Sequence, residues 1–462
     1  MDGIDARLSA ATRRSFPRFT FNFFLKEALP ITRYQEKYNS KKITMDEALA
    51  LIKSGDEIVA GFCGGEPMAI LKQLHTIKDR VTDVTVWYSL GMGKYEFFTN
   101  PELKLHFTTN SWFHGFGARE AHSLGTVSFQ PGHLHNAFTR KIEVKPPNVF
   151  IGTVTPMDQH GYVKTSLSVL YEKTFVEHAD LVIMEVNPHL PNVGGDTELP
   201  IDLVDYFVEV DRPIPVLPTA EVQELDKIIG GYVASLVNDG DTIQLGIGGI
   251  PNAVALAFMD KKDLGVHTEM ITSSMAALAE AGVITGSKKS LHRGKMIGTF
   301  ALGNQKLYDF LDGNPSVQLL RGNYVNNPFV IAKNDNMVSI NTALQVDLSG
   351  QVCSESIGLR TYSGSGGQND TAEGAIHAKN GRSIIALYST AKNGTISAIQ
   401  PWLTPGAAVT LSRNNIDYIV TEYGIAPMKA RTIKQRVENL IAIAHPDFRS
   451  ELREMAFKHE IW

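Results

Sequence analysis

The fold is decided by the stretch GDTIQLGIGGIPN at residues 240–252. Its apolar start predicts a buried strand, its glycines a tight turn, and its end the first turn of a helix. A second stretch, VHTEMI at residues 266–271, predicts another short strand whose end presents a lone carboxylate, Glu269. This arrangement suits an enzyme that brings a carboxylate nucleophile up against a bound thioester or phosphate.

The glycine turn is a candidate anion or oxyanion site. A backbone without Cβ can approach a ligand closely, and the first amides of the following helix have no partner inside it. A nucleotide-binding turn is the alternative. The dinucleotide fingerprint needs a third glycine where this chain has Pro251, and the phosphate loop of nucleotide hydrolases needs a Gly-Lys-Ser/Thr ending. Neither condition is met.

The order of elements predicts an α/β fold. Apolar runs typical of strands alternate with helical stretches, which is the pattern of parallel sheets. A proline-bearing link at residues 211–218 falls near the midpoint of the chain and is the expected boundary. We therefore expect an N-terminal arm at residues 1–40, a first domain at residues 41–217, and a second domain at residues 218–462 that carries Glu269.

The two domains are expected to be related, because residues 48–67 resemble residues 233–251. Both stretches predict a helix, a Gly-Asp turn, a strand, a glycine turn and a second helix. Continued into the next strand, the repeat places Trp87 roughly where the second half has Glu269. Only one half then carries the acid, although most Glu residues at strand ends are simply solvated or paired with a cation. The expected architecture is two related open α/β domains with mostly parallel sheets.

Composition excludes several classes of function. The 462 residues are 43% apolar and 20% charged, with a net charge of −5, so nothing draws the chain to nucleic acid or to an anionic membrane surface. Only two cysteines are present, which argues against a disulfide framework and a cysteine metal cluster. No apolar run approaches the roughly twenty residues that span a bilayer. The expected partners are small molecules and copies of the chain.

The N-terminus leaves the compartment open. Four arginines with several Ser and Thr residues are compatible with an organelle presequence, whereas Asp2 and Asp5 argue against one. A cytoplasmic protein is the expectation, and the matrix of an organelle is the alternative if the N-terminal arm is a presequence.

Several motifs together resemble the family I coenzyme A transferases, in particular the group of 4-hydroxybutyrate CoA-transferases, butyryl-CoA:acetate CoA-transferases and acetyl-CoA hydrolases. The resemblance covers nearly the whole chain beyond the N-terminal arm. Its seven motifs occur in the family's order, at residues 152–162, 245–253, 267–271, 324–328, 341–352, 363–368 and 420–426.

The resemblance implies a mechanism and a set of site residues. Glu269 would attack an acyl-CoA thioester and carry a glutamyl-CoA thioester, and Asn326 would hold its carboxylate or carbonyl. Backbone amides would stabilise the oxyanions, each well-placed donor contributing about 3 kcal/mol. The residues implied around CoA are Gly246, Ile247, Gly248, Gly249, Ile250, Leu344, Gly366 and Gly367. Without the resemblance, these glycines and Asn326 would be ordinary turn residues.

Two motifs depart from the family pattern. Glu269-Met270-Ile271 continues as Thr-Ser-Ser where many relatives have Ser-Asp-Gly, and Gly366-Gly367-Gln368 continues as Asn-Asp-Thr where relatives have Val-Asp-Phe. We expect the chemistry to be retained and the acyl pocket to be altered. A more polar pocket would suit a hydroxylated or dicarboxylic acyl group, such as 4-hydroxybutyrate, succinate or itaconate.

The expected function is transfer of CoA between a short-chain acyl-CoA and a free carboxylic acid of the 4-hydroxybutyrate, butyrate, acetate, succinate or itaconate class. Acyl-CoA hydrolysis on the same fold is the nearest alternative, and a non-catalytic ligand-sensing domain is the second. CoA is expected as a substrate, with no permanently bound cofactor. No metal is expected, because His133 and His135 have no obvious further ligands nearby. The resemblance implies a homodimer or homotetramer.

Overall fold

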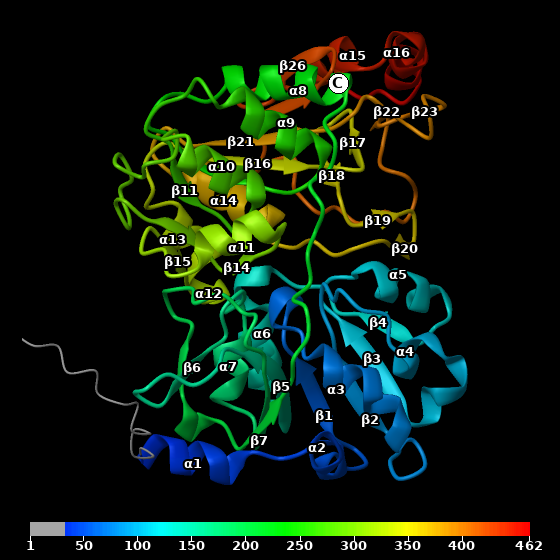
Figure 1. Cartoon of the computed structure of the whole chain (residues 1–462). Helices are drawn as coiled ribbons and strands as arrows, with labels where there is room; N and C mark the ends of the chain where they lie inside the picture. The colour runs from blue at the N-terminus through cyan, green and yellow to red at the C-terminus, as the bar shows by residue number, and fades with distance from the viewer. Residues whose placement is uncertain (1–32) are drawn as a thin grey trace, which may run out of the picture.

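The computed structural model describes residues 33–462, which form two α/β halves stacked on each other (Figure 1). The predicted N-terminal arm lies mostly outside these residues, as does the candidate presequence. From residue 33 the chain is a helix, α1 (Arg33–Lys41), whose Tyr38 packs on Phe207 of the first sheet with ring centroids 4.8 Å apart.

The first half is built on a seven-stranded sheet in the order β4-β3-β2-β1-β5-β7-β9, and all its strand pairs are parallel. Its strands are β1 (Glu57–Ala60), β2 (Val84–Trp87), β3 (Phe107–Ser111), β4 (Val127–Phe129), β5 (Val149–Val154), β7 (Leu181–Val186) and β9 (Tyr206–Glu209). Its further helices are α2 (Met45–Leu51), α3 (Met68–Gln73), α4 (Glu96–Thr99), α5 (Phe116–Ser123), α6 (Leu134–Val144) and α7 (Glu172–Val176). The central strands β1 and β5 are buried along their whole length, as expected of a parallel sheet covered on both faces.

The second half is built on an eight-stranded sheet in the order β15-β13-β11-β10-β16-β21-β25-β26, in which only the pair β25–β26 is antiparallel. Its strands are β10 (Thr242–Leu245), β11 (Gly265–His267), β13 (Met296–Gly298), β15 (Val317–Leu319), β16 (Met337–Thr342), β21 (Arg382–Ala386), β25 (Tyr418–Thr421) and β26 (Gly424–Pro427). Its helices are α8 (Glu224–Ser235), α9 (Gly249–Ala257), α10 (Ser273–Glu280), α11 (Gln305–Leu311), α12 (Gly322–Val325), α13 (Pro328–Ile331), α14 (Gln368–His377), α15 (Ile433–Ile443) and α16 (Arg449–Lys458). The predicted fold, two open α/β units with mostly parallel sheets, is confirmed.

Smaller sheets decorate both halves. They pair β6 (Tyr162–Lys164) with β8 (Glu198–Pro200), β12 (Met270–Ile271) with β14 (Phe300–Ala301), β17 (Gln345–Asp347) with β18 (Val352–Cys353) and β24 (Ile399–Gln400), β19 (Ser356–Ile357) with β20 (Arg360–Thr361), and β22 (Thr390–Ala391) with β23 (Ile396–Ser397).

The strand orders bear out the internal repeat, because β3-β2-β1-β5-β7-β9 matches β13-β11-β10-β16-β21-β25. The register corrects one detail of the expected alignment. Ile58 pairs with Val86 in the first half, and Ile243 pairs with Val266 in the second. Trp87 is therefore the counterpart of His267, and the residue that corresponds to Glu269 is Ser89, two positions later. The first half still lacks the acid.

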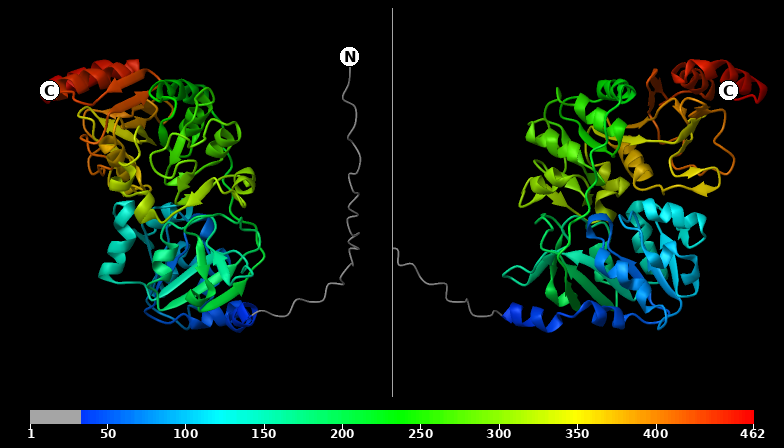
Figure 2. Two further views of the ribbon diagram at one scale, coloured as in Figure 1. Left: turned by 90° about the vertical axis from the view of Figure 1, so that its left-hand side faces the viewer. Right: turned by 45° about the vertical axis from the view of Figure 1, so that its right-hand side comes forward.

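A segment without regular structure, residues 210–223, carries the chain from the first half to the second (Figures 1 and 2). It is attached to both: Arg212 forms an ion pair of 2.9 Å with buried Glu185, and the Leu217 amide donates to the Gly303 carbonyl at 2.8 Å. One apolar cluster contains residues of both halves, including Phe62 and Phe300, whose ring centroids are 4.8 Å apart. The halves thus share a packed interface.

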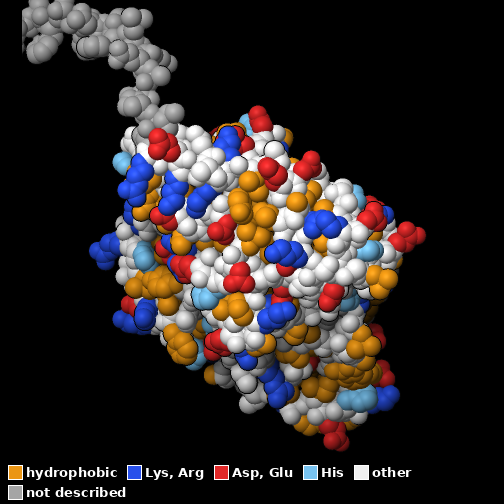
Figure 3. Space-filling model, turned by 90° about the horizontal axis from the view of Figure 1, so that it is seen from below, with side chains coloured by type: hydrophobic (Ala, Val, Ile, Leu, Met, Phe, Trp, Pro, Cys, Tyr) orange, Lys and Arg blue, Asp and Glu red, His pale blue; other side chains and the backbone are white. Residues whose placement is uncertain are grey.

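The surface of the first half is mixed in charge. Seen from below, acidic and basic side chains are both spread over this face (Figure 3). Among residues 33–462, no helix combines the length and the apolar character that crossing a membrane requires.

Candidate active site

Glu269 lies where the chain leaves the main sheet of the second half. β11 ends at His267, and after two intervening residues β12 begins at Met270 and pairs with β14. The Glu269 carbonyl accepts a hydrogen bond from the Thr299 amide at 2.9 Å, and the Thr268 amide donates to the Ile297 carbonyl at 2.9 Å. Backbone bonds on both sides therefore hold Glu269 at the carboxyl end of the sheet, where parallel α/β folds place their ligands.

The side chain of Glu269 is part-buried and has two donors. Asn326, directly after α12, donates from Nδ2 to Oε2 at 3.2 Å, and the Gly367 amide also bonds the carboxylate. The pKa of Glu269 is raised to about 7: burial is the main cause, the Asp370 charge acts in the same direction, and the two donors oppose the rise. The group is poised to change its charge near neutral pH.

Gly367 approaches the carboxylate so closely that no side chain fits. A Cβ on this residue would lie 2.1 Å from Glu269 Oε2 and 2.2 Å from Asn326 Nδ2. Its neighbour Gly366 has a φ of +51°, in the left-handed region that favours glycine. Gly367 is thus required by the contact with Glu269, and Gly366 by its backbone conformation.

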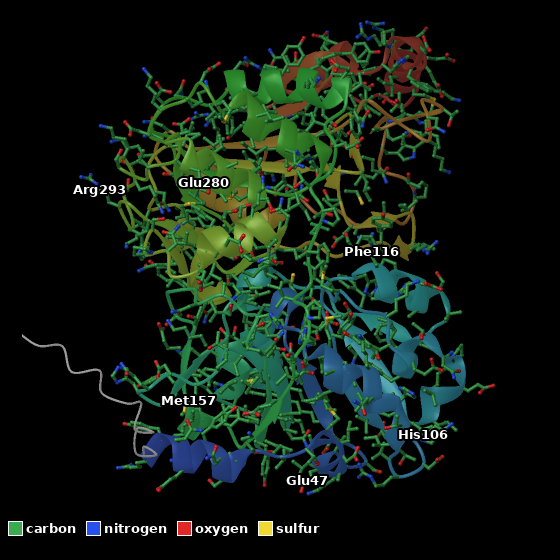
Figure 4. All side chains as sticks on the ribbon, in the orientation of Figure 1. Glu47, His106, Phe116, Met157, Glu280 and Arg293 are labelled. Carbon is green, nitrogen blue, oxygen red and sulfur yellow. The ribbon has the colours of Figure 1, made fainter. Side chains whose placement is uncertain are left out.

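A cavity of about 540 Å³ opens beside Glu269 between the two halves. The first half contributes Phe62, Phe113 and Arg119, and its exposed Phe116 lies on the side that faces the second half (Figure 4). Five of the predicted site residues line this cavity together with Glu269: Gly246, Ile247, Leu344, Gly366 and Gly367.

Four predicted residues are not part of the cavity lining: Gly248, Gly249, Ile250 and Asn326, the last of which contacts Glu269 by its hydrogen bond. Gly248 has a φ of +119° and caps the first turn of α9. A Cβ on Gly249 would lie 2.6 Å from the Asp226 carboxylate, so this glycine allows α9 to pack on α8. The end of the glycine turn is required by the backbone and by helix packing, and its start faces the cavity.

The altered motif residues do not line the cavity either. Ser273 and Ser274 begin α10, capped by Thr272, and Thr371 joins a buried hydrogen-bond network with Ser339 at 3.0 Å. The polar part of the lining comes from other side chains, namely Ser89, Gln244, Thr268, Asn341, Thr342, Ser354, Tyr362, Ser363, Ser365 and Gln368.

Two further residues are important that the sequence patterns did not single out. His267 is buried and donates from Nε2 to the Val325 carbonyl at 2.9 Å, which ties the strand before Glu269 to the residue before Asn326. Burial lowers the pKa of His267 to about 3, so this ring is neutral. Arg119 is the only cation among the described residues that line the cavity. It stacks on Tyr362 at 4.1 Å and donates to the Tyr362 carbonyl at 2.8 Å.

No set of three or more His, Cys, Asp or Glu side chains in the described part of the chain is arranged to hold a metal ion. His133 and His135 instead lie beside a single carboxylate, that of Asp370.

The fold and the site define a class: an enzyme with two related α/β halves, a carboxylate at a sheet end and a cavity beside it. Residues 28–218 match the N-terminal domain of the acetyl-CoA hydrolase/transferase family, and residues 303–456 match its C-terminal domain.

The chain is similar to individual proteins over most of its length. It is 42% identical to a succinyl-CoA:cyclohexane-1-carboxylate CoA transferase of Geobacter metallireducens, over 92% of this chain and 96% of that protein. It is 43% identical to a 4-hydroxybutyrate coenzyme A transferase of Clostridium kluyveri, over 91% and 98%. The crystal structure of RipA from Yersinia pestis superposes with a TM-score of 0.88 at 35% identity, over 93% of this chain and all of that one. The chain therefore belongs to the acetyl-CoA hydrolase/transferase family. The resemblance is confirmed, as is the expectation of an enzyme of the CoA-transferase type.

Proposed function

We propose that the enzyme transfers CoA between a short-chain acyl-CoA and a free carboxylic acid through a glutamyl-CoA thioester on Glu269. The observation that carries this proposal is the carboxylate itself: it is held by Asn326 and Gly367 at the edge of a cavity between the two halves. A carboxylate in this position, partly shielded from water, is a nucleophile that a thioester carbonyl can reach.

The transfer needs no reactant other than Glu269, the acyl-CoA and the acceptor acid. Glu269 attacks the thioester carbonyl, which gives an acyl-glutamyl anhydride and CoA thiolate. The thiolate attacks the glutamyl carbonyl, forms the glutamyl-CoA thioester and releases the first acid. A second acid runs the two steps in reverse and leaves as its own CoA ester. The energy of the thioester bond is kept throughout.

Backbone amides are available for the oxyanion of each tetrahedral intermediate. The Gly367 amide already bonds the Glu269 carboxylate, and Gly246 and Ile247 line the same cavity. Donors fixed in a partly buried site need little reorganisation when charge develops, which is why each lowers the barrier by about 3 kcal/mol.

The acid substrates are of the class of 4-hydroxybutyrate, butyrate, acetate, succinate and itaconate. The relatives in Clostridium kluyveri and Geobacter metallireducens are named for 4-hydroxybutyrate and for succinyl-CoA. The lining of the cavity is partly polar, as a hydroxylated or dicarboxylic chain requires: Gln244 and Asn341 both belong to it and hydrogen-bond each other at 3.1 Å. Arg119 supplies a positive charge for an anionic group of either substrate.

Hydrolysis is the second candidate function, because only the acceptor differs. Butyryl-CoA, succinyl-CoA and 4-hydroxybutyryl-CoA should each be incubated with the enzyme, with and without acetate, and the CoA species separated by chromatography. We expect acetyl-CoA to appear in step with consumption of the donor, and little free CoA. Free CoA released in proportion to the donor, whether or not acetate is present, would identify a hydrolase.

The rate of acyl-CoA consumption should depend on pH through Glu269. The ionised carboxylate is the nucleophile, so the rate falls as pH decreases through the raised pKa of about 7. Well below that value the rate drops about tenfold per pH unit, because the fraction of Glu269 that is ionised drops by the same factor. Single-turnover rates in a series of buffers at constant ionic strength test this. A rate that stays constant well below pH 7 would contradict the ionisation of Glu269 as the controlling step.

A further inference from the structure

A second cluster of ionisable side chains lies at the interface between the halves. Asp370, in the first turn of α14, is 1% exposed and accepts two hydrogen bonds from one residue of the first half. The His135 amide donates to Oδ2 at 2.9 Å, and His135 Nδ1 donates to Oδ1 at 2.9 Å. The two residues are 235 positions apart. One histidine of α6 therefore binds the first turn of α14 through both its backbone amide and its side chain.

The hydrogen bonds from His135 hold a segment that contacts the proposed nucleophile, Glu269. Asp370 follows Gly367 by three residues, and the Thr371 amide donates to the Gly367 carbonyl at 2.9 Å. Gly367 in turn bonds Glu269. A shift in the first turn of α14 would thus move an amide that holds the reacting carboxylate.

The charges of Asp370 and His135 also affect the ionisation of Glu269. Asp370 raises the pKa of Glu269, because a second negative charge nearby opposes the ionisation of Glu269. A positive charge on His135 offsets this repulsion. The hydrogen bond to Asp370 raises the pKa of His135, and the charge of Glu373 acts in the same direction.

Among the charged and titratable groups around His135, the carboxylate of Asp370 makes the shortest contact with the ring. His133, whose ring lies 5.9 Å from that of His135, is half-exposed and 3.6 Å from the Asp370 carboxylate. Two further helices pack against α6. α12 carries no charged side chain. α7 carries Glu172, which accepts from the Phe62 amide at 2.9 Å, and Lys173, which lies 3.7 Å from the carboxylate of Asp196.

We propose that His135 is a positioning residue: as an imidazolium it binds Asp370 across the interface, holds Gly367 against Glu269, and balances the Asp370 charge that opposes ionisation of the nucleophile. The inference rests on the proposed role of Glu269.

The test is the pH dependence of glutamyl-CoA formation, followed by rapid quench and intact mass, in wild type, His135→Asn and Asp370→Asn. His135→Asn keeps the backbone hydrogen bond to Asp370 and a side-chain donor but loses the positive charge. The acid limb of the pH–rate profile, where the rate falls with decreasing pH, should therefore move to higher pH. Asp370→Asn removes the opposing charge, so the limb should move to lower pH. Each shift is expected to be about one unit or less, with KM for the acyl-CoA changed less than kcat. His133→Asn, beside the same carboxylate, is the matched control and should move the limb least.

The outcomes separate the inference from the function on which it rests. If the wild type forms the adduct and the two variants lose rate equally at every pH, the pair is only structural and the inference is wrong. If the wild type forms no adduct at any pH, the proposed function fails and the inference with it. Should His135→Asn or Asp370→Asn not fold, the wild-type imidazole can be titrated by NMR with labelled histidine, the His135 signal being the one that is missing from His135→Gln. A midpoint for His135 below that of an ordinary histidine would overturn the proposal.

Discussion

Replacing Glu269 with glutamine is expected to abolish CoA transfer, with kcat lowered by at least about 10⁴-fold, as for the loss of other enzyme nucleophiles. Glutamine has nearly the same shape and can still accept from Asn326 and Gly367, so the site should remain assembled. Its amide oxygen is not a nucleophile toward a thioester and cannot form the anhydride. Steady-state assays with each acyl-CoA and acid, at pH 8 and above, where wild-type Glu269 is ionised, measure the effect.

Glu280→Gln is the matched control. Glu280 is exposed on α10 of the same half, away from the cavity (Figure 4), and the same change there should leave kcat and KM unaltered. Thermal unfolding of both variants should match the wild type. A Glu269→Gln enzyme that kept a tenth of its activity would show that another group carries the acyl chemistry.

Replacing Gly367 with alanine is expected to lower kcat by about 10²–10³-fold, the range seen when one oxyanion donor is lost. The new Cβ would lie 2.1 Å from Glu269 Oε2, so the loop or the carboxylate has to move and the amide loses its position. The yield of the CoA adduct in rapid-quench experiments should fall with kcat.

Gly231→Ala provides the comparison. Gly231 is exposed within α8, and a Cβ there has no neighbour within 4 Å. Alanine at this position should raise stability by about 1 kcal/mol, because glycine is a poor helix former, and leave turnover unchanged. A Gly367→Ala variant with wild-type kcat would mean that the Gly367 amide does not contribute to the reaction.

Much of the fold could be predicted from local pattern. The Gly-Asp turns before β1 and β10 recur at matching places, and the apolar strands that follow are fully buried. Both halves therefore follow from signals within about thirty residues, the length of one strand–helix–strand unit. The sequence repeat places the counterpart of Glu269 two residues too early because the loops between the strands differ in length, and only the pairings of Ile58 with Val86 and of Ile243 with Val266 settle the register.

The site could be predicted only in part. The strand-end pattern points to Glu269, the resemblance adds Asn326 and Gly367, and the structure brings the three within hydrogen-bond distance from three separate segments. His267 lay within the quoted motif, but its bond to Val325 depends on how α12 packs against the sheet. The contacts of Arg119 and His135 cross the interface between the halves, and no local pattern encodes such contacts.

The central claim is that Glu269 carries CoA covalently, and intact-protein mass after incubation with acetyl-, butyryl-, succinyl- or 4-hydroxybutyryl-CoA tests it most directly. We expect an increase in mass equal to CoA minus water on the wild type, located by proteolysis to the peptide that contains Glu269, and none on Glu269→Gln. Consumption of the thioester with no adduct on the wild type, or an adduct on another residue, would contradict it.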